Sequence, residues 1–187
     1  MNHLCGLGLK HDTDKSPYWR GNTGHPYTPF YEQLLMGRKV KRLLEIGVCT
    51  GASIRMWEEF LPDAEIYGLD IVPEVIAETK FATDRVKLKL SDASDASSLL
   101  SMMREINGSF DIIIDDGSHL VKDQITAANT LIPFLEWNGT YIIEDVQFGT
   151  EKEVSLGINY PTRIMFPTSP VAPHRSDDCL ILAWRYL

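Results

Sequence analysis

The sequence predicts an α/β protein with a Rossmann-like, doubly wound, seven-stranded and mostly parallel sheet. From residue 42 onward, short apolar segments alternate with amphipathic segments, which is typical of βαβ units. Several apolar segments end in an acidic residue, where a parallel sheet binds its ligands. The chain has 187 residues, 44% of them hydrophobic, which suits a single domain with a substantial core.

The expected strands are short runs rich in β-branched and other apolar residues. They lie at residues 42–47, 65–71, 85–90, 110–115, 140–145, 162–166 and 179–186. Residues 52–60 are expected to form a helix, because Ile54, Trp57 and Phe60 recur on one helical face. Pro73 opens the next helix at its first position, where a missing N–H is tolerated.

The second half of the expected sheet is bounded by helix caps and turns. A helix over residues 97–106 ends before Asn107-Gly108, a stop signal. Ser118 is expected to cap a helix that runs to Leu135, and Asn138-Gly139 turns the chain into the fifth strand. A proline-rich loop, residues 167–173, joins the last two strands.

We expect one domain with two parts: an N-terminal lid and helix, residues 1–37, and the Rossmann-like core, residues 38–187. Residues 11–29 are rich in Gly, Pro, Thr and aromatic residues and predict an irregular, functional lid before a helix at 30–36.

Composition excludes several classes of protein. The net charge of −8 and the pI near 5.1 argue against a nucleic-acid surface. No apolar run is long enough to span a bilayer, and the first residues do not resemble a signal peptide. Three widely spaced cysteines make neither a disulfide framework nor a zinc cluster, so we expect a reduced, cytoplasmic protein.

Two consecutive strands end in acidic residues. The first is followed by Asp115-Asp116-Gly117-Ser118-His119, and the second by Glu144-Asp145. The ends of neighbouring parallel strands meet in one crevice. Crowded carboxylates raise each other's pKa values, a conflict that one hard divalent cation with oxygen ligands resolves. These residues therefore indicate a metal site.

The first three strands end in residues that suit a nucleotide. Gly47 and Gly51 allow the backbone to approach a ligand closely. Asp70 could accept both hydroxyls of a ribose, and Asp92 could accept a hydrogen bond from an adenine amino group. Taken singly, Glu45 could be a solvated strand end, Asp70 a turn residue and Asp92 a helix cap. Together, at successive strand ends, they favour a nucleotide site.

The run Leu44-Glu45-Ile46-Gly47-Val48-Cys49-Thr50-Gly51-Ala52-Ser53 resembles the first motif of the class I S-adenosylmethionine-dependent methyltransferases. With Thr13-Asp14-Lys15, His25-Pro26-Tyr27 and the two acidic motifs, the chain resembles the metal-dependent sugar O-methyltransferases that modify the deoxysugars of macrolide antibiotics. The resemblance covers about residues 11–150, and we do not expect these 187 residues to include the extra N-terminal domain of the macrolide enzymes.

This resemblance implies S-adenosylmethionine and Mg²⁺ as cofactors and a role for each matched residue. Asp116, Glu144 and Asp145 would hold the metal, and His119 would be the general base. The expected cofactor-binding residues are Glu45, Gly47, Gly51, Ser53, Asp70, Ile71, Asp92, Ala93, Asp115 and Lys15. Lys15 and His25 could serve either the donor or the acceptor, and Tyr27 and Tyr31 either shape the acceptor pocket or anchor the lid.

The expected activity is methyl transfer to a sugar hydroxyl in glycan or natural-product tailoring. Three alternatives stay open: a phenolic or catechol-type acceptor, a non-catalytic donor-binding module, and an NAD-dependent oxidoreductase. The last is disfavoured because Cys49 stands where the dinucleotide fingerprint has glycine. The expected partner is a small-molecule or glycan acceptor, with no nucleic acid and no membrane, and a homo-oligomer is compatible with the sequence.

Overall fold

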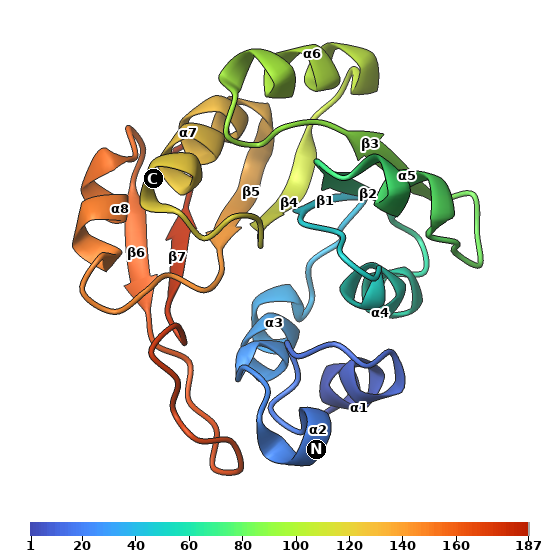
Figure 1. Cartoon of the computed structure of the whole chain (residues 1–187), viewed down its shortest axis with the longest axis vertical. Helices are drawn as coiled ribbons and strands as arrows, with labels where there is room; N and C mark the ends of the chain where they lie inside the picture. Colours follow the sequence, from blue (N-terminus) through green and yellow to red (C-terminus); the bar gives the residue numbers. More distant parts are fainter. Residues whose placement is uncertain (187) are drawn as a thin grey trace.

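The computed structural model describes residues 1–186 and contains one seven-stranded sheet with the order β3-β2-β1-β4-β5-β7-β6 (Figure 1). Its strands are β1 (Arg42–Ile46), β2 (Glu65–Asp70), β3 (Val86–Leu90), β4 (Phe110–Asp115), β5 (Leu135–Ile143), β6 (Thr162–Met165) and β7 (Leu180–Ala183). The strands β1 to β5 pair in parallel, and β7 runs antiparallel to both β5 and β6. The predicted fold class is confirmed.

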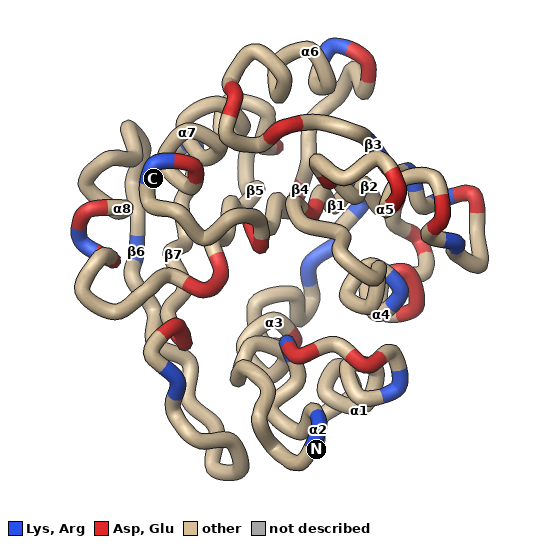
Figure 2. The backbone as a smooth tube through the Cα atoms, in the orientation of Figure 1, with Lys and Arg blue, Asp and Glu red and all other residues tan. Residues whose placement is uncertain are grey.

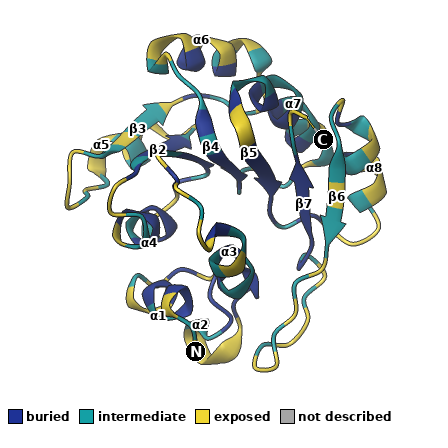
Figure 3. Cartoon of the chain, turned by 180° about the vertical axis from the view of Figure 1, so that it is seen from behind, coloured by how far each residue is buried: buried dark blue, intermediate teal, exposed yellow. Residues whose placement is uncertain are grey.

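Helices cover both faces of this sheet. They are α1 (His3–Lys10), α2 (Trp19–Asn22), α3 (Tyr27–Leu35), α4 (Ala52–Phe60), α5 (Pro73–Glu78), α6 (Ala96–Ile106), α7 (Val121–Leu131) and α8 (Glu151–Gly157). On one face, α6, α7 and α8 pack against Leu44, Ile113 and Tyr141. On the other, α1, α3 and α4 pack against Leu43, Ile112 and Ile142. Because neighbouring residues of a strand point to opposite faces, the apolar central strands are buried on both sides (Figure 3).

Several boundaries differ from the expectation. Helix α7 ends at Leu131 and not at Leu135, α3 begins at Tyr27 and not at residue 30, and β7 ends at Ala183 and not at residue 186. Two further differences have local reasons. The prediction that Ser118 caps α7 was wrong: the helix begins at Val121, and the Ser118 hydroxyl donates to Asp123 at 2.8 Å instead. His119 has a left-handed backbone (φ +59°), so the helix cannot extend back through it. Strand β5 begins at Leu135 rather than residue 140, so Asn138-Gly139 lies inside it, opposite an irregular register between Phe110 and Ile112.

The N-terminal part is more regular than predicted. Helix α1 buries Leu4, Cys5 and Leu7 although its sequence was not expected to be helical, and α8 in the tail was likewise missed. Helices α1 and α3 lie at the carboxyl ends of the strands, where acidic residues from separate parts of the chain gather (Figures 1 and 2). Within residues 1–186, no helix combines the length and apolarity needed to cross a membrane.

Candidate functional site

A cleft of about 590 Å³ opens at the carboxyl ends of the strands. Seven carboxyl side chains line it: Asp14, Asp70, Asp92, Asp115, Asp116, Asp123 and Asp145. Among the described residues, no lysine or arginine lines this cleft. The remaining lining includes Gly47, Cys49, Ile71, Ala93, His119 and Gln124. The cleft is therefore strongly acidic along its whole length.

The loop after β1 needs its glycines. Gly47 has φ +91°, and a Cβ there would lie 2.1 Å from the carbonyl oxygen of Asp116. Gly51 has φ +75°, and its Cβ would lie 2.6 Å from the side chain of Thr79. Only glycine satisfies both the left-handed backbone and the close approach. The loop thus passes against the backbone that follows β4, and this contact joins the two expected parts of the site.

Asp70 supports the same loop from the end of β2. Its Oδ2 accepts hydrogen bonds from the backbone N–H groups of Val48 (2.9 Å) and Cys49 (3.0 Å), while its Oδ1 accepts from Val72 (2.9 Å). Asp92 accepts from the backbone and the hydroxyl of Ser94, as in an Asx turn. Both carboxylates line the cleft, and both also shape its walls.

Asp116, His119 and Asp145 bring their ligating atoms within 4.8 Å of one another. The backbones of His119 (φ +59°) and Asp145 (φ +52°) are both left-handed, a strained conformation that is often found at functional sites. His119 Nε2 lies 4.0 Å from Asp145 Oδ2, and His119 Nδ1 is buried without a hydrogen-bond partner in the part of the chain that is described. The oxygens of the two carboxylates suit a hard divalent cation, and the imidazole lies beside them.

Lys15 lies behind this group and not in the cleft. Its ammonium is 2.5 Å from Asp116 Oδ2 and 3.2 Å from Glu45 Oε1, and it also contacts Glu144. The second oxygen of Glu144 accepts a hydrogen bond from the hydroxyl of Tyr31 at 2.5 Å. Lys15, Glu45, Tyr31 and Glu144 are each no more than 1% exposed. Both oxygens of Glu144, an expected metal ligand, therefore face hydrogen-bond donors of the N-terminal part.

Burial and charge shift the pKa values of this cluster. Burial lowers the pKa of Lys15, but three adjacent carboxylates outweigh it and raise that pKa well above the usual value. Burial raises the pKa of Glu144 and of Glu45, although Lys15 opposes it. Burial also raises the pKa of Asp115 to about 7, despite a hydrogen bond from the Tyr141 hydroxyl at 2.9 Å. One ammonium does not balance the acids around it, and excess negative charge favours a bound cation.

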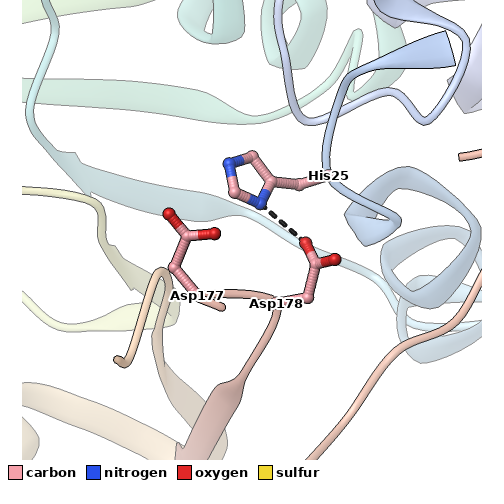
Figure 4. Close-up of side chains that lie close together, drawn as sticks. All are labelled: His25, Asp177 and Asp178. Carbon is pink, nitrogen blue, oxygen red and sulfur yellow. Dashed lines mark hydrogen bonds and ion pairs between the residues drawn. The ribbon is translucent and has the colours of Figure 1, made fainter. Parts of the chain in front are cut away.

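The three expected acceptor-binding residues are buried behind the carboxylates. His25, Tyr27 and Tyr31 are at most 2% exposed, and none of them lines the cleft. Tyr27 donates a hydrogen bond to Asp145 at 2.7 Å. His25 Nδ1 lies 2.8 Å from Asp178 Oδ1, a partner in the C-terminal loop (Figure 4).

The expected cofactor residues divide into two groups. The cleft is lined by Gly47, Asp70, Ile71, Asp92, Ala93 and Asp115. The residues Glu45, Gly51, Ser53 and Lys15 lie outside that lining. Asp123 and Gln124 line the cleft but were not singled out in the sequence, and Asp14, part of the Thr13-Asp14-Lys15 motif, lines it without an assigned role. Asp14 adjoins Lys15, and Asp123 and Gln124 follow His119 by four and five residues, so proximity to the motifs was the available signal.

A family model described as a methyltransferase domain matches residues 44–146. Among curated relatives, an 8-demethyl-8-alpha-L-rhamnosyl tetracenomycin-C 2'-O-methyltransferase of Streptomyces olivaceus is 36% identical over 153 residues, covering 77% of this chain and 38% of the relative. A mycinamicin VI 2''-O-methyltransferase of Micromonospora griseorubida is 36% identical over 133 residues, covering 65% and 32%. The chain thus matches about a third of the length of these relatives, 38% of the first and 32% of the second.

Solved structures agree with the fold. The MycE methyltransferase of the mycinamycin biosynthetic pathway, in complex with Mg, SAH and mycinamycin VI, has a TM-score of 0.68 and 30% identity, over 84% of this chain and 45% of that one. The SAH-bound Podospora anserina methyltransferase PaMTH1 has a TM-score of 0.61 at 18% identity, over 98% and 88%, which shows the fold alone. Because the family model covers more than half of the chain and the sheet has the matching topology, the chain belongs to the methyltransferase-domain family, with the class I methyltransferase fold.

Proposed function

We propose that this chain is a Mg²⁺-dependent methyltransferase that moves the methyl group of S-adenosylmethionine to a sugar hydroxyl of a natural product or glycan. The observation that carries the proposal is the convergence of Asp116, His119 and Asp145 in a cleft that also contains the glycine loop after β1. The named functions of the relatives, which methylate sugar hydroxyls, support the same acceptor class.

The donor would lie across the ends of β1, β2 and β3. The close backbone at Gly47 leaves room for its amino-acid part, and Asp70 and Asp92 would meet its ribose and adenine. Asp70 already accepts three backbone hydrogen bonds. A carboxylate has about four acceptor sites, so one remains, which suits one ribose hydroxyl and not the two that the sequence led us to expect. The carboxylate would then hold the loop and the donor together.

Asp116 and Asp145 would hold the cation, since their oxygens face the cleft beside His119. Bound Mg²⁺ would lower the pKa of an acceptor hydroxyl and orient it. Glu144 stays a predicted ligand, and it could join only if the ammonium of Lys15 moved away from it.

His119 would be the general base. Its side chain is 36% exposed and lines the cleft, so neutral Nε2 can take the proton of the acceptor hydroxyl. The hydroxyl oxygen then forms a bond to the methyl carbon as the carbon–sulfur bond breaks, leaving S-adenosylhomocysteine. Because this in-line displacement needs aligned reactants, positioning supplies much of the remaining catalysis.

The charge of the cleft favours a neutral acceptor. Its described lining has seven carboxyl groups and no lysine or arginine that could pair with a phosphate or carboxylate. A sugar hydroxyl fits this lining, and a vicinal phenolic hydroxyl stays the alternative acceptor. A cytoplasmic location and a homo-oligomer stay predictions.

The test is methyl transfer to a rhamnosylated acceptor with and without EDTA. We expect chelation to stop turnover and added Mg²⁺ to restore it. Asp116→Asn removes a charged oxygen ligand and should raise the Mg²⁺ concentration needed for half-maximal rate. Asp84→Asn, at an exposed loop position, controls for the loss of one carboxylate. Full activity in EDTA would refute the metal requirement, and transfer to catechol alone would favour the phenolic alternative.

A further inference from the structure

Asp145 differs from the other carboxylates of the cleft because its two oxygens face different surroundings. Oδ1 accepts a hydrogen bond from the Tyr27 hydroxyl at 2.7 Å and lies 3.4 Å from His25 Nδ1. Oδ2 lies 4.0 Å from His119 Nε2, on the side of the cleft. One oxygen is thus held from behind, and the other is presented to the site.

The backbone of Asp145 is held by the same tyrosine. Asp145 has φ +52°, a conformation that costs a non-glycine residue about 1–3 kcal/mol and persists only where neighbours enforce it. Its N–H donates to the Tyr27 hydroxyl oxygen at 3.2 Å. Tyr27 therefore fixes both the backbone and the side chain of Asp145.

His25 and Asp178 complete this support. The ring of His25 stacks on Tyr27 with centroids 4.8 Å apart and an interplanar angle of 14°. His25 Nδ1 lies 2.8 Å from Asp178 Oδ1, and Asp178 Oδ2 accepts from the backbone N–H of Arg175 at 2.7 Å (Figure 4). His25 and Asp178 are 2% and 1% exposed, and neither lines the cleft.

The group of His25, Asp177 and Asp178 is compact enough to be considered as a second metal site. However, His25 Nδ1 already faces Asp178 Oδ1 at hydrogen-bond distance, as Figure 4 shows. The arrangement is an aspartate–histidine pair whose histidine also faces Asp145. Its geometry suits holding a carboxylate in place.

We propose that His25 and Asp178 are positioning residues that act through Asp145 and set the affinity of the site for its divalent cation. This inference rests on the proposed metal-dependent function. A carboxylate that is oriented before binding loses less rotamer freedom when it takes a cation. Outer partners of metal ligands typically contribute 10–100-fold to metal affinity. His25 lies in the N-terminal lid and Asp178 in the loop between β6 and β7. The cation site is therefore complete only when both segments pack beside Asp145.

The experiment measures Mn²⁺ binding to the full chain by calorimetry, with Mn²⁺ standing in for Mg²⁺ at an oxygen-rich site. His25→Phe keeps a ring on Tyr27 but removes the hydrogen bond of the imidazole to Asp178 and its close approach to Asp145. We expect Mn²⁺ to bind about 10–100-fold more weakly, while S-adenosylhomocysteine binds within about twofold of the parent. His3→Phe, which replaces an exposed imidazole in the same N-terminal part, should leave both affinities unchanged.

Two further variants separate positioning from general loosening. His25→Gln retains an N–H donor and should recover part of the lost Mn²⁺ affinity. Asp178→Asn keeps the side-chain volume and weakens the interaction of His25 with Asp178 from the C-terminal loop. It is the second test if His25→Phe does not fold. Unchanged Mn²⁺ affinity in these folded variants overturns the inference, as does an equal loss of S-adenosylhomocysteine affinity with a lower thermal midpoint. If the parent itself binds no Mn²⁺, the proposed metal-dependent function is refuted. If the parent binds Mn²⁺ and the variants bind it equally well, only the positioning role of His25 and Asp178 is refuted.

Discussion

The two halves of the cleft are built in different ways. In the donor half, at the ends of β1 to β3, the supporting contacts are local in the chain: Asp70 bonds to Val48 and Cys49, 22 and 21 residues away. In the acidic half, at the ends of β4 and β5, the contacts that the lid makes with the carboxylates span more than a hundred residues. Lys15 and Glu144 are 129 residues apart, and Tyr27 and Asp145 are 118 apart.

The two halves therefore depend on different segments of the chain. The donor half depends mainly on the pairing of β1 with β2, because its glycines and Asp70 belong to that βαβ unit. The acidic half places buried carboxylates that must be compensated by groups from the lid and the C-terminal loop. Perturbing the lid should therefore weaken the acidic half first and leave the donor half in place.

The largest expected effect comes from His119→Ala. If the acidic half carries the chemistry and the donor half only binds, turnover should fall by about 10²–10⁴-fold, the usual contribution of a general base. Affinity for S-adenosylhomocysteine, measured by calorimetry, should stay within about twofold. A loss below about tenfold would assign the proton to solvent or to a carboxylate, and a parallel loss of donor affinity would contradict the division between the halves.

Lys15→Met tests the compensation of charge in the acidic half. It leaves Glu144 and Asp116 without the ammonium, and removing one partner of a buried ion pair typically costs about 3–5 kcal/mol. We expect a loss of that size in the free energy of unfolding, measured with urea. Lys10→Met, which breaks the exposed pair with Glu59, should change the free energy of unfolding far less, because solvent screens that pair.

Unfolding of the parent and of Lys15→Met in the presence of Mg²⁺ tests whether Glu144 is a cation ligand. If Glu144 takes part in cation binding once the ammonium is gone, Mg²⁺ should stabilise Lys15→Met more than it stabilises the parent. Equal stabilisation of both proteins would leave Asp116 and Asp145 as the ligands and Glu144 as a partner of Lys15 alone.

The features that the sequence predicted are those that depend on neighbouring residues, as in the donor half. The features that it did not predict depend on residues far apart in the chain, as in the acidic half. The alternation of apolar segments predicted the sheet, and the glycines after β1 predicted a close backbone, because both depend on neighbouring residues. The place of Lys15 could not be predicted, since its partners lie at positions 45, 116 and 144. The Ser118 cap was wrong because the left-handed backbone of His119 comes from the site and not from local helix propensity.

Gly47 is where the two halves touch, and Gly47→Ala tests whether they depend on each other. The new Cβ would lie 2.1 Å from the carbonyl oxygen of Asp116, so the donor loop, the backbone after β4, or both must shift. Left-handed backbone alone costs an alanine about 1–2 kcal/mol. Gly37→Ala has a similar φ of +71° with no atom within 4 Å of the added Cβ, so it isolates that backbone cost.

We expect Gly47→Ala to lose about 1–3 kcal/mol more stability than Gly37→Ala in urea unfolding, because overpacking adds to the backbone strain. Affinities for both S-adenosylhomocysteine and Mn²⁺ should fall in Gly47→Ala, since one shift displaces the donor loop and Asp116 together, and neither should fall in Gly37→Ala. Loss of donor affinity alone would mean that the loop moves while the backbone after β4 stays. Among the glycines of residues 1–186, Gly47 alone would place a Cβ against Asp116. The two halves would then be separable even at this contact.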